Sequence, residues 1–143
     1  MKKSLTIFIM LGVLFSNDSP YVVVLGIAQD GGMPHAGCEK PCCEGLWTTN
    51  QGEKVSCIGI VDPLTKKSWM IDATPDLPEQ LRTLTLVHKT ELAGIFLTHA
   101  HMGHYTGLLE FGREVMGAKN IPIFAMPKMR SFLEDNGPWN CLL

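Results

Sequence analysis

The sequence predicts an α/β fold, because apolar runs of strand length alternate along the chain with segments of helical periodicity. The first run is Tyr21 to Ile27, which is rich in β-branched residues and is expected to form a buried strand. A helical pattern follows, with Leu77, Leu81 and Leu84 on one face. The apolar run Ala93 to Leu97 then ends directly before three closely spaced histidines. Ligand chemistry in an open α/β sheet lies at the carboxyl ends of strands, so these histidines mark the candidate site.

The composition is that of an ordinary globular protein. The chain has 143 residues, of which 45% are hydrophobic and 18% charged, with a formal net charge of -2 and a pI near 6.2. These values lie in the usual range for a folded domain. The closest approach to a basic cluster is Lys66-Lys67, in an apparent turn, so the charge pattern excludes a nucleic-acid partner.

The N-terminal segment, residues 1–19, has the pattern of a signal peptide. Lys2 and Lys3 precede an apolar stretch from Leu5 to Phe15, after which the chain becomes abruptly polar at Ser16. The stretch is shorter than the roughly 20 residues that a membrane-spanning helix needs, so no integral membrane span is expected in the mature chain. A buried first strand or helix is the alternative. The signal predicts a periplasmic or secreted protein whose mature chain begins near Ser19.

Besides the runs Tyr21 to Ile27 and Ala93 to Leu97, three further strands are expected. Residues 55–61 and 68–71 flank a segment with turn chemistry, Asp62 to Lys67, which predicts an antiparallel pair. Asp72 closes the second member of this pair. Residues 121–125 form the last apolar run.

Helices are expected between the strands. Asp76 before Leu77-Pro78 is a helix start, and the helix should run to about His88 with Val87 on its apolar face. A second helix should begin at His104 or Tyr105 and stop at Gly117. Pro127 opens a short third helix whose inward residues are Met129, Phe132 and Leu133.

The histidines at 99, 101 and 104 carry the strongest chemical signal. His99 and His101 are two residues apart, so in an extended segment both rings project from one face. His104 follows Gly103 near the amino end of the next expected helix, where the macrodipole favours a neutral ring. Neutral imidazole is the form that binds a metal, so we expect a metal site here. The alternative is a set of solvated surface histidines.

A second cluster lies in the glycine-rich loop after the first strand. Cys38, Cys42 and Cys43 are close enough in sequence to share a structural zinc, with His35 as a candidate fourth ligand. In an exported protein the alternative is a disulfide between Cys38 and one of the other two. The total of five cysteines is odd, so at least one thiol is unpaired, and Cys57 is expected to be a buried apolar residue.

The histidine block resembles the His-x-His-x-Asp-His signature of the metallo-β-lactamase fold, with Gly103 at the position of the aspartate. The resemblance implies that His99 and His101 bind a first metal, that His104 binds a second, and that Asp72 supports the site from below. Loss of the carboxylate should weaken the second position. The loop from Ala28 to Cys38 is similar to the opening of the pyrroloquinoline quinone biosynthesis protein B group, a branch of the same fold in which this loop lines the site.

This resemblance also implies the architecture. Residues 20–143 correspond to the N-terminal half of an αβ/βα sandwich, a mixed sheet covered by helices, and the chain is interpreted as truncated. The later metal ligands of the family have no counterpart here. A half-sandwich would expose an apolar sheet face, which predicts self-association.

The predicted function is metal-assisted hydrolysis. Zinc, one ion or two, would activate water for attack on an ester, lactone, amide or phosphoester of a small-molecule substrate. The candidate metal ligands are His99, His101 and His104, and the candidate catalytic residues are His104 and Asp72. Two alternatives stay open: an iron-dependent oxidase or hydroxylase of the pyrroloquinoline quinone type, and a non-catalytic metal-binding fragment.

Overall fold

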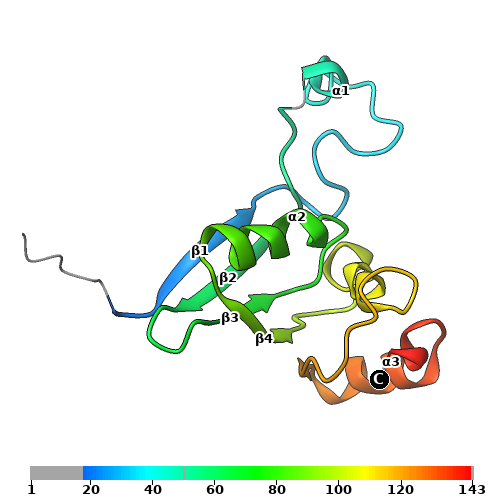
Figure 1. Ribbon diagram of the computed structural model, residues 1–143. Coiled ribbons are helices and arrows are strands. Elements are labelled where there is room, and N and C mark those ends of the chain that lie inside the picture. Colours follow the sequence, from blue (N-terminus) through cyan, green and yellow to red (C-terminus); the bar gives the residue numbers. More distant parts are fainter. Residues whose placement is uncertain (1–17, 50, 143) are drawn as a thin grey trace, which may run out of the picture.

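Five strands form one mixed sheet in the computed structural model, which describes residues 18–49 and 51–142 (Figure 1). The strands lie in sequence order and are β1 (Tyr21–Gly26), β2 (Cys57–Asp62), β3 (Lys67–Ile71), β4 (Glu91–Phe96) and β5 (Ile123–Phe124). The first three pair antiparallel, and β3, β4 and β5 pair in parallel. The expected antiparallel pair around the 62–67 turn is confirmed. Most of the proposed signal peptide lies outside the described residues.

Helical segments fill the connections. They are α1 (Leu46–Thr49), α2 (Leu77–Arg82), the π-helical η1 (Thr83–Val87), the 3-10 segments η2 (Met102–His104) and η3 (Thr106–Phe111), α3 (Pro127–Asp135) and the 3-10 segment η4 (Trp139–Cys141). Figure 1 shows α2 lying across one face of the sheet and α1 at the outer end of the long β1–β2 loop. No helix in residues 18–49 and 51–142 has the length and apolar character needed to cross a membrane.

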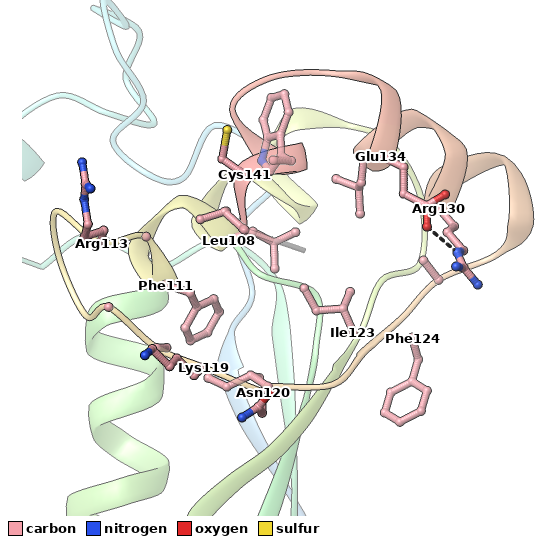
Figure 2. A pocket seen from close by; sticks show the side chains of 18 residues that line it. Leu108, Phe111, Arg113, Lys119, Asn120, Ile123, Phe124, Arg130, Glu134 and Cys141 are labelled. Atoms are coloured by element: carbon pink, nitrogen blue, oxygen red, sulfur yellow. Dashed lines mark hydrogen bonds and ion pairs between the residues drawn. The ribbon is translucent and has the colours of Figure 1, made fainter.

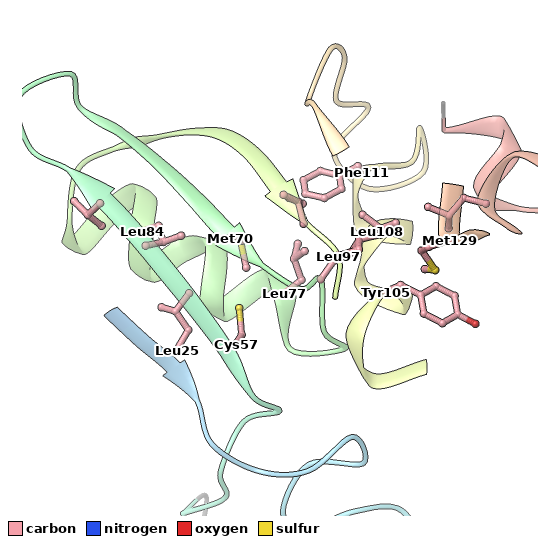
Figure 3. Close-up of a cluster of buried hydrophobic side chains, with 14 residues drawn as sticks. Leu25, Cys57, Met70, Leu77, Leu84, Leu97, Tyr105, Leu108, Phe111 and Met129 are labelled. Carbon is pink, nitrogen blue, oxygen red and sulfur yellow. The ribbon is translucent and has the colours of Figure 1, made fainter. Parts of the chain in front are cut away.

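The core lies between the sheet and α2–η1 and continues toward η3 and α3 (Figure 3). Met70 of β3, Ile95 of β4, Leu77 of α2 and Leu84 of η1 are all fully buried. A Cβ at Gly59 of β2 would lie 2.7 Å from a methyl carbon of Leu84, so the glycine lets the helix approach the sheet closely. This packing fixes β3 and β4 side by side, and the candidate site lies at their carboxyl ends.

The opposite face of the sheet is apolar and largely open to solvent. The sequence predicts a buried first strand, but Val22 and Val24 of β1 are 63% and 66% exposed, because β1 is an edge strand with side chains on this face. The strand registers align two rows of side chains here, formed by Val22, Val24, Ile58, Ile60, Trp69, Ile71, Phe96 and Phe124. We call this surface the open sheet face.

Two helix predictions differ from the structure. Val87 is 67% exposed, because the last turn of this helix is π-helical and carries the residue off the apolar face. The expected α-helix from His104 to Val115 is instead a pair of 3-10 segments. Two backbone hydrogen bonds explain this: Ala73 N donates to His104 O at 2.9 Å, and Gly107 N donates to Ala73 O at 2.9 Å. The chain is thus tied to the end of β3, and a regular helix cannot form there.

Candidate metal centre

Asp72 anchors the site at the end of β3. Its side chain is buried, and its backbone has a φ of 71°, a left-handed conformation that Asp tolerates better than most residues. Oδ1 accepts hydrogen bonds from Thr98 N at 2.8 Å and Thr98 Oγ1 at 2.9 Å. Because Thr98 lies two residues after the end of β4 and directly before His99, this carboxylate fixes the start of the histidine segment against the end of β3.

His104 lies between two carboxylates. Its Nδ1 is 2.8 Å from Asp72 Oδ2, and its Nε2 is 3.1 Å from Asp30 Oδ1. Partial burial alone would lower the pKa of His104, but the hydrogen bonds to Asp72 and Asp30 outweigh it, and the pKa is raised. The surroundings of His104 therefore favour positive charge, supplied either by a second proton on the ring or by a metal ion bound at Nε2.

The other two histidines lie beside this pair. His101 Nδ1 is 3.2 Å from Asp30 Oδ2, and the ring of His101 is well exposed. The ring centroid of His99 is 4.6 Å from that of His101 and 4.2 Å from that of His104. His99 Nδ1 is held 2.9 Å from Thr98 Oγ1. The structure thus brings all three predicted histidines together, with Asp72 behind them.

Asp30 was missed by the sequence analysis. It lies in the β1–β2 loop, 74 residues from His104, and its two oxygens face different histidines. The hydrogen bond to His104 holds the pKa of Asp30 below its ordinary value. The one available signal was that Asp30 is the sole acid between Ala28 and Cys38, in a loop expected to line the site.

The loop that carries Asp30 is held by backbone hydrogen bonds to residues 53–56, the segment that leads into β2. Ala28 N donates to Lys54 O at 2.8 Å, Ser56 N donates to Ala28 O at 2.8 Å, and Met33 N donates to Glu53 O at 3.0 Å. Such bonds on both sides of Asp30 give its carboxylate a defined position beside the histidines.

The cysteine cluster lies further along the same loop. Donor atoms of His35, Cys38 and Cys43 all lie within 4.8 Å of one another, which satisfies the spacing of a metal site. Cys38 and Cys43 are buried, whereas Cys42 is exposed and is not part of this group, although its sulfur lies 3.8 Å from that of Cys43. A hydrogen bond between the side chains of Cys38 and Cys43 raises the pKa of Cys43 to about 11 and lowers the pKa of Cys38.

All five cysteines are free thiols in the structure, so the disulfide alternative is not realised. His35, the candidate fourth ligand, lies with Cys38 and Cys43 as predicted, whereas Cys42 lies outside this group. The physical reason is that Cys42 and Cys43 are neighbours in a turn, and only Cys43 faces inward. Cys57 is 3% exposed in the core, as expected.

A cavity of about 870 Å³ lies away from the histidines, between η3, the 118–125 segment and the C-terminal helices (Figure 2). Leu108, Phe111 and Ile123 are among its lining residues, and Arg130 on its wall pairs with Glu134 at 2.7 Å. None of the three histidines lines it, so this cavity does not belong to the candidate metal centre.

The histidine and carboxylate donors fit a divalent transition metal, because imidazole nitrogen and carboxylate oxygen are ligands that zinc and iron accept. His104 also has the arrangement of a metal-binding histidine, with one ring nitrogen fixed by a buried carboxylate and the other turned toward further donors. A mixed sheet with such donors at its carboxyl edge defines a class of metal-dependent α/β proteins.

Comparison with known proteins makes the class specific. Residues 68–142, just over half of the chain, match the Beta-lactamase superfamily domain, and this region holds most of β3, all of β4, Asp72 and the three histidines. The chain therefore belongs to the beta-lactamase superfamily.

Among its relatives is coenzyme PQQ synthesis protein B. The protein from Klebsiella pneumoniae (strain 342) is 32% identical over 97 residues, which is 62% of this chain and 32% of that protein. The protein from Rhodopseudomonas palustris (strain TIE-1) is 28% identical over 128 residues, which is 85% of this chain and 40% of that protein. The chain thus spans about a third to two fifths of the length of these relatives.

Solved structures agree on the fold. Zn²⁺-bound PqqB from Methylobacterium extorquens superposes with a TM-score of 0.70 at 24% identity, over 85% of this chain and 45% of that one. A diphosphatase of the PhnP family superposes with a TM-score of 0.60 at 24% identity, over 81% and 45%. These similarities confirm the predicted metallo-β-lactamase-type architecture.

Proposed function

We propose that the whole protein is a zinc-dependent hydrolase that acts on an ester, lactone, amide or phosphoester of a small molecule. The observation that carries the proposal is the position of His104 between Asp72 and Asp30, with His99 and His101 beside it. Membership of the beta-lactamase superfamily and the similarity to a diphosphatase support a hydrolase. A zinc-bound relative supports the choice of metal.

His99, His101 and His104 would hold one or two zinc ions, and the metal would supply Lewis-acid activation of water and of the substrate oxygen. Asp72 keeps the proton of His104 on Nδ1, so the lone pair of Nε2 faces outward toward the ligand position. In a one-metal centre, His104 would instead accept and return the proton of the attacking water through Nε2, with Asp72 stabilising the charged ring. The exposed side of His101 leaves room for a substrate to approach.

The test is zinc-dependent turnover of chromogenic phosphodiesters and esters by the whole protein. His104→Ala should abolish turnover, whereas His88→Ala, a histidine at the end of η1, should leave it unchanged. Turnover that survives removal of His104 and of zinc would refute the proposal. A protein that binds zinc but turns over nothing would support the non-catalytic alternative.

A second candidate is an iron-dependent oxidase or hydroxylase. It is favoured by the similarity to coenzyme PQQ synthesis proteins B and by the nitrogen-rich donor set. Elemental analysis separates the two proposals, because iron with oxygen consumption contradicts hydrolysis.

We also propose a structural zinc at His35, Cys38 and Cys43. Three donors within 4.8 Å support it, and two of them are buried thiols. The ion would tie together the outer part of the β1–β2 loop, whose inner part carries Asp30.

The open sheet face is the proposed surface for self-association with a second copy of this chain. Its side chains are uncharged and apolar, and five of them (Val22, Val24, Ile58, Phe96 and Phe124) are 39% to 66% exposed, so two copies can pair face to face without charge repulsion. Val24→Lys should shift a dimer to monomer in analytical ultracentrifugation, whereas Leu64→Lys, in the exposed β2–β3 turn, should not. A monomeric parent chain would refute the proposal.

Export is proposed from the pattern of residues 1–19. Cell fractionation tests it, since removal of these residues should retain the protein in the cytoplasm. A full chain found in the cytoplasm would count against export.

A further inference from the structure

We propose that Asp30 is itself a metal ligand, and that its carboxylate joins the His101 side of the centre to the His104 side. The inference rests on the proposed metal site and adds to it an anionic ligand from the β1–β2 loop. Residues 99–104 contribute imidazole nitrogens alone, which leave the charge of a divalent ion uncompensated.

The donor distances carry the assignment. Two ligands that each lie about 2.1 Å from a tetrahedral metal are about 3.4 Å apart. Asp30 Oδ1 is 3.1 Å from His104 Nε2, and Asp30 Oδ2 is 3.2 Å from His101 Nδ1. Both pairs therefore have nearly the separation of donors that share an ion. Each oxygen serves a different histidine, as in a carboxylate that bridges two metal positions.

The other acidic residue of the cluster cannot fill this role. Asp72 is buried, and both of its oxygens already accept hydrogen bonds from Thr98. Its contact with the cluster is through His104 Nδ1, on the side of the ring that faces away from Asp30. Asp72 is thus a positioning residue, and Asp30, with a side chain 42% exposed, is the acid that faces the open side of the centre.

Gly103 makes the approach of Asp30 possible. A Cβ at this position would lie 2.5 Å from the carbonyl oxygen of Asp30 and 2.6 Å from its Cα. Any side chain at residue 103 would therefore push the β1–β2 loop away from the histidines. The histidine segment contains no carboxylate, because Gly103 occupies the position at which the signature has an aspartate. The same glycine leaves space for the carboxylate of Asp30 from the β1–β2 loop.

Cobalt substitution of the full chain tests the assignment directly. Asp30→Cys, in a Cys38→Ser/Cys43→Ser background that removes the thiolate site, should give a new thiolate-to-cobalt charge-transfer absorption on adding Co²⁺. The background chain should lack that band. Absence of the band in the cysteine variant would overturn the proposal.

A second measurement does not depend on that background. Asp30→Asn in the otherwise unchanged chain should weaken Zn²⁺ at the histidine centre at least tenfold in chelator competition. Glu53→Gln, an exposed acid on the segment that pairs with the same loop, is the matched control and should bind like the parent. Parental affinity in Asp30→Asn would overturn the inference.

His104→Ala separates this inference from the proposed function. If that variant loses Zn²⁺ while Asp30→Asn keeps it, the metal site stands and Asp30 is not a ligand. If His104→Ala also binds like the parent, the histidine centre itself is refuted and the inference falls with it.

Discussion

Replacement of Asp72 by Asn should change which nitrogen of His104 carries the proton. The substitution keeps the shape of the side chain, and Asn tolerates the φ of 71° at this position, so the backbone is not disturbed. Thr98 N donates to Oδ1, which must therefore remain the amide oxygen. The new NH₂ group then takes the place of Oδ2 and faces His104 Nδ1 at 2.8 Å.

An NH₂ group can only donate to a ring nitrogen, so His104 must move its proton to Nε2. That nitrogen faces Asp30 and is the one proposed to bind the metal. Metal affinity should fall by about 10- to 100-fold, the usual effect of losing such a supporting carboxylate, which is about 1.4 to 2.7 kcal/mol. The metal-free chain should also lose about 1 kcal/mol of unfolding free energy, since the hydrogen bond between a charged carboxylate and His104 is replaced by a weaker, neutral one.

Competition with a chelator measures the affinity, and urea unfolding of the metal-free chain measures the stability. Asp62→Asn is the matched control, because Asp62 also accepts from a backbone amide and a threonine hydroxyl, at Leu64 N and Thr65 Oγ1, but lies in the β2–β3 turn. The reasoning is refuted if the Asp72 variant binds zinc as tightly as the Asp62 variant.

Three further predictions concern packing and the thiols. Gly107→Ala should destabilise the chain by about 1 to 3 kcal/mol, because its Cβ would overlap a backbone carbonyl. Gly137→Ala, whose Cβ would have no neighbour nearer than 3.8 Å, should not destabilise it. Equal urea midpoints for the two variants would contradict this prediction. Burial raises the pKa of Cys57 to about 12. The stability gained by keeping this thiol neutral is therefore full below pH 9.0 and is lost as the pH rises toward 12. Thiol reagents should leave Cys57 unlabelled at about pH 8 unless the fold opens. Cys43→Ser should lower zinc content by one ion in elemental analysis while Cys42→Ser does not, and equal loss would contradict the assigned ligands.

The sequence predicted the local parts of this fold well, because they depend on local patterns. The turn chemistry of Asp62 to Lys67 was enough to predict the β2–β3 hairpin, and Pro127 correctly marked the start of α3. The segment after His104 was wrong, since its shape depends on backbone hydrogen bonds to Ala73, a contact that no periodicity reveals. The exposure of Val22 and Val24 was missed because an edge strand and a central strand have the same β-branched composition.

The site shows the same limit. The three histidines were found because they lie within six positions and follow an apolar strand. Asp30 was not, because only the folded β1–β2 loop brings it beside His101 and His104. Similarly, spacing suggested three sulfurs and His35 for the outer cluster, whereas the folded loop brings only the two buried sulfurs, of Cys38 and Cys43, close to His35.

Anomalous diffraction at the zinc absorption edge, from crystals of the zinc-loaded protein, tests the central claim most directly. The account predicts a peak within bonding distance of His104 Nε2 and a carboxylate oxygen of Asp30, separate from any peak at Cys38 and Cys43. Zinc at the cysteines alone, with His104 still hydrogen-bonded to both carboxylates, would contradict it.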